Sequence, residues 1–134
     1  MKRVAEYLKT LGIRPNLRGY VFISESVDMI IKGDVTSGLL YKYGFFVISK
    51  KHKTTPVRIE RAVRHAICSS WDRYPDRYAK LLGFEYRPNL SEFLFELAET
   101  IRNEIESDDQ SDLTEPIKTE IIITTEDNIV EFPA

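Results

Sequence analysis

The chain has 134 residues, of which 43% are hydrophobic, and a formal net charge of −2. This length suffices for one compact domain with its own core. No run approaches the roughly 20 apolar residues that a membrane span needs, and the N-terminus, MKRVAEYLKTLG, lacks the apolar centre and cleavage site of a signal peptide. The single cysteine excludes an internal disulfide framework and fits a reducing cytosol, so we expect a cytoplasmic globular protein.

The net charge hides a division along the sequence. Residues 1–103 hold 18 Lys and Arg against 11 Asp and Glu, a net charge of +7, whereas residues 104–134 hold 1 against 10, a net charge of −9. Residues 42–64 contain seven Lys and Arg residues and one acid, Glu60. Such clustering is the electrostatic footprint of a nucleic-acid binder, although a solvated surface stripe has the same composition.

Apolar residues at helical spacing predict three helices in the first part of the chain, over residues 4–11, 19–33 and 39–51. The third contains Gly44, which costs about 1 kcal/mol relative to alanine inside a helix. The predicted core positions of the second helix are Val21, Phe22, Val27, Ile30 and Ile31. Those of the third helix are Leu40, Tyr43, Val47 and Ile48.

A fourth helix, predicted over residues 57–71, has two unlike faces. At about 100° per residue, one face gathers the apolar side chains Ile59, Ala62, Val63, Ala66 and Ile67. The other face gathers Val57, Arg58, Arg61, Arg64 and His65. This arrangement suits a helix that is buried on one side and meets phosphates and base edges on the other.

The residues before this helix predict a tight turn. Thr54 or Thr55 can cap the helix, and Pro56 suits the first helical position because its missing N–H has no helical partner there. The basic stretch SKKHK ends the preceding helix. A helix, a turn of three or four residues and a basic amphipathic helix form the helix-turn-helix plan, but a purely structural corner gives the same pattern.

The rest of the chain predicts two more helices and a tail. A fifth helix covers residues 75–82, and the pair Asn89 and Glu92 resembles a capping box that opens a sixth. The apolar stripe of the sixth helix, interpreted as core, is Phe93, Leu94, Leu97, Ala98, Ile101 and Ile105. Residues 107–116 are predicted to be an acidic linker and residues 117–134 a β-hairpin. We therefore predict an all-α, six-helix domain over residues 1–106 followed by that linker and hairpin.

The stretch TTPVRIERAVRHAICSSW resembles part of the C-terminal DNA-binding domain of the sporulation response regulator, stage 0 sporulation protein A. The stretches LRGYVFISESVDMII, ISKKHK and NLSEFLFELAETI match the same family in kind and order. The resemblance covers residues 1–106 and implies a six-helix domain whose third and fourth helices form the helix-turn-helix. It also implies a transcription regulator that binds short boxes on double-stranded DNA, as a homodimer or as adjacent copies on tandem sites.

Carried across residue by residue, the resemblance implies that Glu60 and Arg61 read bases and that Arg58, Arg64 and His65 lie at or beside the DNA. Arginine can pair with guanine O6 and N7, and a carboxylate can accept a hydrogen bond from cytosine N4. We assign Arg58 and Arg64 to base reading as well. For Glu60 an ion pair with Arg64, four residues on, remains the structural alternative. The predicted contacts to the DNA backbone are Lys50, Lys51, Lys53, Thr54, Thr55 and His65.

The sequence departs from the family in three places. Family proteins carry a receiver domain ahead of this one, and here the sequence begins almost at the DNA-binding domain, so we expect a stand-alone effector domain. Before the turn, GFFVISKK replaces the family's LYPDIAKK, which predicts a different setting for the first helix of the motif. Val57 replaces a small polar residue that could touch DNA in the family, so the resemblance does not define the exact target sequence.

Other chemistry finds little support. His52 and His65 lack a cysteine pair and are flanked by cations, which disfavours a metal site, and Cys68 lacks the base and orienting group of a catalytic thiol. We predict no catalytic residue, no cofactor, no small-molecule substrate and no membrane partner. The alternative function is an interaction module that keeps the fold, binds a relative or partner through the hairpin, and shields its basic face with the acidic tail.

Overall fold

The computed structural model describes residues 2–117 and divides the chain into two compact units, residues 1–101 and 102–134. The elements, in order, are α1 (Lys2–Leu11), α2 (Arg18–Ile31), a 3-10 turn η1 (Ser37–Leu39), a π-helical turn η2 (Leu40–Gly44), α3 (Phe45–Lys51), α4 (Pro56–Arg73), α5 (Pro75–Leu82) and α6 (Leu90–Ile117). No strand occurs among the described residues, and the predicted all-α class is confirmed. Residues 118–134, most of the predicted hairpin, lie outside the described part of the chain.

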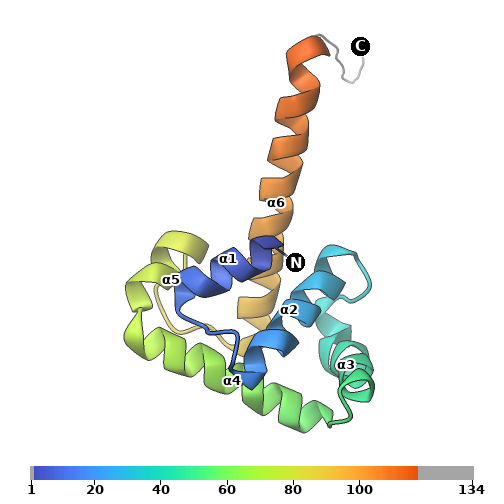
Figure 1. The fold of residues 1–134 in the computed structure, drawn as a ribbon, viewed down its shortest axis with the longest axis vertical. Coiled ribbons are helices and arrows are strands. Elements are labelled where there is room, and N and C mark those ends of the chain that lie inside the picture. The colour runs from blue at the N-terminus through green and yellow to red at the C-terminus, as the bar shows by residue number, and fades with distance from the viewer. Residues whose placement is uncertain (1, 118–134) are drawn as a thin grey trace. The chain divides into compact units, whose positions relative to one another are not determined.

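The first unit is organised around α4, which packs against α2, α3 and α5 (Figure 1). Its most extensive contact is with α2, where Gly19 lies directly against the α4 backbone. A Cβ atom at Gly19 would lie 2.5 Å from the carbonyl oxygen of Ala62, so only glycine allows this approach without a shift of the two helices. None of the helices described is long and apolar enough to span a membrane.

The region predicted as one helix over residues 39–51 is broken into three pieces, and two of its predicted core positions are wrong. Leu40 and Ile48 are buried, whereas Tyr43 and Val47 are 48% and 38% exposed. The backbone N–H of Phe45 bonds to the carbonyl of Leu40, five residues back, so the π turn inserts one residue into the helical repeat. The buried face shifts by one residue after Leu40, to Gly44, Phe45, Ile48 and Ser49.

The predictions for the second and sixth helices hold in most positions. In α2, Phe22, Val27 and Ile30 are buried, but Val21 is 39% exposed. In the sixth helix the core stripe is buried from Phe93 to Ile101, as predicted, and Ile105 is half-buried.

The capping box of α6 forms as predicted. The backbone N–H of Glu92 donates to Asn89 Oδ1 at 2.8 Å, and the backbone N–H of Asn89 donates to Glu92 Oε1 at 2.9 Å. The helix then continues to Ile117, so residues 107–116 are helical where the sequence predicted a linker. No glycine or proline occurs between Leu90 and Glu115, so no residue in this stretch breaks the backbone hydrogen bonding.

Candidate nucleic-acid interface

The turn between α3 and α4 is closed by backbone hydrogen bonds at the end of α3. The N–H of Thr54 donates to the carbonyl of Ser49 at 2.9 Å, and the N–H of Lys53 faces the carbonyl of Lys50 at 3.5 Å. Lys53 takes a left-handed conformation with φ of 54°, the only positive φ among the described non-glycine residues. This is the Schellman arrangement, in which glycine is the usual residue at the left-handed position. The lysine therefore occupies a strained position in the middle of the motif.

The hydrogen bonding at the start of α4 shows which of the two threonines caps the helix. The Oγ1 atom of Thr55 accepts a hydrogen bond from the N–H of Arg58 at 3.2 Å, and Pro56 is the first helical residue. Thr55 is thus the cap. The Oγ1 atom of Thr54 is buried and has no hydrogen-bond partner among the described residues. Thr54 was predicted to contact the DNA backbone, and its hydroxyl does not face solvent in this conformation.

The two faces of α4 lie as the sequence predicted. The inner face is fixed by the buried side chains of Ile59, Val63, Ala66 and Ile67, and Ala62 is half-buried opposite Gly19. The outer face exposes Val57, Arg58, Arg61, Arg64 and His65. In the part of the chain that the structure describes, Arg58 and Arg61 form no ion pair, so their charges are available to a ligand.

Glu60 and Arg64 behave differently, because they pair with each other. The Oε2 atom of Glu60 accepts a hydrogen bond from Nη2 of Arg64, one helical turn on. Tyr41, on the π turn, lies beside this pair. Burial raises the pKa of the Tyr41 hydroxyl above its usual value, and the Glu60 carboxylate raises the pKa further while Arg64 opposes the shift. The structural alternative for Glu60 is therefore present in the protein without DNA, and Tyr41 was not predicted to belong to the site.

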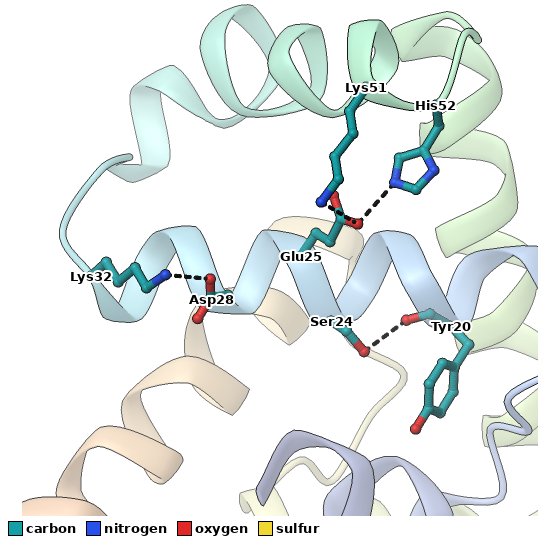
Figure 2. Close-up of polar contacts among 7 residues, drawn as sticks. All are labelled: Tyr20, Ser24, Glu25, Asp28, Lys32, Lys51 and His52. Atoms are coloured by element: carbon teal, nitrogen blue, oxygen red, sulfur yellow. Dashed lines mark hydrogen bonds and ion pairs between the residues drawn. The ribbon is translucent and has the colours of Figure 1, made fainter. Parts of the chain in front are cut away.

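Glu25 on α2 forms ion pairs with two residues at the end of α3 (Figure 2). Its Oε2 atom lies 2.8 Å from Nε2 of His52 and 3.2 Å from Nζ of Lys51. The His52 ring also packs edge-on against Phe22, with the ring centroids 5.5 Å apart. Since Glu25 lies 27 residues before His52, no local pattern in the sequence could have revealed this clamp.

The remaining predicted phosphate contacts lie on the surface. Lys50 places its ammonium 5.2 Å from the centroid of the Phe46 ring, and Lys53 is exposed. A hollow of about 390 Å³ lies between the start of α2 and the outer face of α4, lined in part by Arg18, Arg61 and His65. Three basic side chains around one hollow suit a phosphate group. No cluster of three or more metal-binding side chains occurs among residues 2–117.

A comparison with protein families identifies the domain. The family model described as "Sporulation initiation factor Spo0A C terminal" matches residues 4–101. The chain belongs to this family. The match spans the helices from α1 to α5 and the start of α6, including the whole helix-turn-helix, and it confirms the resemblance expected from the sequence. As a Spo0A C-terminal domain, the protein is of the DNA-binding, transcription-regulating type found as the effector part of a sporulation response regulator.

Proposed function

We propose that this protein is a sequence-specific regulator that inserts the N-terminal half of α4 into the major groove of double-stranded DNA. The observation that supports this most directly is that Arg58 and Arg61 are exposed and form no ion pair with any residue of 2–117, on a helix whose opposite face is buried. A rigid anchored helix can hold guanidinium groups in one register against base edges.

The spacing of the arginines suits this role. Three helical residues rise about 4.5 Å, which is comparable to the 3.4 Å step along one DNA strand. Arg61 can therefore pair with guanine O6 and N7 while Arg58 reaches a neighbouring position or phosphate. Val57 is 55% exposed beside them and offers an apolar contact to a thymine methyl group.

Glu60 and Arg64 act in this proposal as a coupled pair. On DNA the Glu60 carboxylate accepts a hydrogen bond from cytosine N4, and Arg64 turns from Glu60 toward a base or phosphate. The exchange loses an exposed helical ion pair worth about 0.2–0.5 kcal/mol, which a single good base contact of about 1–3 kcal/mol outweighs.

The DNA backbone is held by side chains around the motif. Lys50, Lys53, Thr55 and His65 contact phosphates directly in this proposal. Lys51 contributes only after it exchanges the Glu25 carboxylate for a phosphate oxygen, since the two now lie 3.2 Å apart. We further propose that two copies bind adjacent boxes, each with its own α4 in the groove.

The test is selection of bound duplexes from a random pool by the full chain and by Arg61→Ala, each at two salt concentrations. Wild type should enrich one short motif at both concentrations. Arg61→Ala should bind that motif about 1–3 kcal/mol more weakly and lose discrimination at one base position.

Lys32→Ala is the matched control, because it removes one positive charge from a surface side chain that pairs with Asp28, at 3.0 Å, and lies outside the motif. It should leave the selected motif unchanged. Base preference that is unaltered in Arg61→Ala would contradict the assignment of this residue, and a pool that shows no enriched motif at either salt concentration would contradict sequence-specific binding.

A further inference from the structure

A second basic site lies at the other end of α4 from the turn. A pocket of about 570 Å³ opens between the end of α1, the connector to α2, and the junction of α4 with α5. Its polar wall carries four cationic side chains, Lys9, Arg14, Arg73 and Arg77, and no carboxylate belongs to its lining. The volume falls within the range of about 300–1,000 Å³ that small-molecule sites occupy.

The arginines of this pocket are arranged around one aromatic ring. The guanidinium carbon of Arg77 lies 3.9 Å from the centroid of the Tyr74 ring, and that of Arg73 lies 5.9 Å from it. Arg77 is also fixed by a hydrogen bond from Nη1 to the carbonyl oxygen of Thr10, at 2.9 Å. A guanidinium held on both sides is pre-organised, so little side-chain entropy is lost when it binds an anion.

The Tyr74 ring is itself held in place by the end of α1. Gly12 has φ of +84°, and a Cβ atom there would lie 2.5 Å from Cε2 of Tyr74. The ring therefore lies against the glycine backbone, and Tyr20 supplies a second aromatic side chain to the pocket. These rings and the buried Ile13 give the pocket an apolar wall beside its cations.

Among the residues that line the pocket, no carboxylate balances the positive charges. The C-terminal ends of α1 and α4 supply about half a negative charge each through their dipoles, against four positive side chains. A ligand with one or more phosphate groups would supply the missing negative charge, and arginine forks bind phosphate oxygens in pairs. A flat ring on the same ligand would pack against the Tyr20 ring.

We propose that this pocket binds a small phosphorylated ligand with a planar ring, of the size and chemistry of a nucleoside monophosphate. The phosphate is held by Arg14, Arg73 and Arg77, and the ring lies against Tyr20, since the guanidinium of Arg77 already lies 3.9 Å from the Tyr74 ring centroid. Arg58 and Arg73 are about 22 Å apart along the helix axis, so the ligand leaves the DNA-facing arginines free. The proposal does not depend on which bases α4 reads.

The test is isothermal titration of the full chain with GMP and AMP, and separately with guanosine and with inorganic phosphate. At least one nucleotide should bind more tightly than either of its parts. Arg73→Gln and Arg14→Gln should each weaken nucleotide binding at least tenfold. The side chain of Arg14 has no hydrogen bond or ion pair to a described residue, so its variant stays informative if Arg73→Gln unfolds. Lys32→Gln, which lies outside the pocket, should bind nucleotide like wild type.

Several results would overturn the proposal. The proposal is wrong if neither nucleotide releases or absorbs heat, or if phosphate alone binds as tightly as the nucleotides. It is also wrong if Lys32→Gln weakens nucleotide binding as much as Arg14→Gln and Arg73→Gln do. A titration of the same variants with duplex DNA separates the remaining explanation. If Arg14→Gln and Arg73→Gln lose DNA affinity while wild type ignores nucleotides, the pocket is part of the DNA contact and not a ligand site.

Discussion

The close approach of α2 and α4 at Gly19 makes the position of the DNA-facing helix sensitive to a single methyl group. A Cβ atom at Gly19 would lie 2.5 Å from the Ala62 carbonyl oxygen and 3.0 Å from the Cβ atom of Ala66. Because backbone cannot rotate aside, the helices must separate by about 0.5 Å before the first contact reaches even 3.0 Å. Such overpacking costs about 1–3 kcal/mol, whereas alanine gains about 1 kcal/mol of helix propensity over glycine.

Gly19→Ala should therefore lower the free energy of unfolding by up to about 2 kcal/mol, measured by urea denaturation. It should also weaken specific DNA binding, because Arg61 adjoins the displaced Ala62 and base contacts depend on placement. Gly38→Ala is the matched control, since no atom lies within 4 Å of a Cβ atom at that position. If Gly19→Ala were as stable as wild type and bound DNA equally well, the reasoning that α2 sets the position of α4 would be wrong.

Three further predictions concern the turn, the core and the tail. Lys53→Gly should raise the free energy of unfolding by about 1 kcal/mol in urea denaturation, because glycine adopts the left-handed conformation without strain. If the Lys53 ammonium contacts a phosphate, the same variant should reduce the salt slope of DNA binding by about 0.9. An unchanged free energy of unfolding would contradict the strain at Lys53. Burial raises the pKa of Tyr78 to about 12, so this phenol ionises at lower pH in the unfolded protein than in the folded protein. Alkaline denaturation should show stability that is intact below pH 10 and falls by about 2–3 kcal/mol as the pH rises to 12, a loss that Tyr78→Phe should remove. Deletion of residues 107–134, which hold eight acids and one lysine, should raise DNA affinity in titrations at low salt, because it removes the repulsion between these acids and DNA. At high salt the deletion should have little effect, because ions screen that repulsion. Equal affinities at low salt would contradict shielding of the basic face by the acidic tail.

The sequence predicted those parts of the fold where one helix face is apolar and no residue interrupts the helical repeat. In α4 the apolar positions recur at helical spacing from Ile59 to Ile67, so pattern and burial agree. The same holds for the stripe of α6 from Phe93 to Ile101. Where aliphatic and aromatic residues together fill most positions, as in residues 39–47, several registers are about equally apolar and the pattern cannot distinguish between them. The π turn at Leu40 then exposed Tyr43 and Val47 against expectation.

The candidate site divides in a similar way. The arginines of α4 could be predicted because they share one helix, whose geometry is known from spacing alone. Glu25 and Tyr41 could not, because they reach the motif from α2 and the π turn through tertiary packing. The ion pair of Glu60 with Arg64 was predicted as an alternative, and the spacing alone could not show which role Glu60 takes.

The placement of carboxylates distinguishes the positive side chains that serve the fold from those that are open to a ligand. Glu25 lies against Lys51 and His52, and Glu60 lies against Arg64, so these cations are partly neutralised by the protein itself. Arg58 and Arg61 have no such partner among residues 2–117. An exposed charge gains little from the fold, since surface ion pairs contribute about 0–1 kcal/mol, whereas a base contact on DNA gives more. The two unpaired arginines are therefore where the sequence of a bound duplex should have its largest effect on affinity.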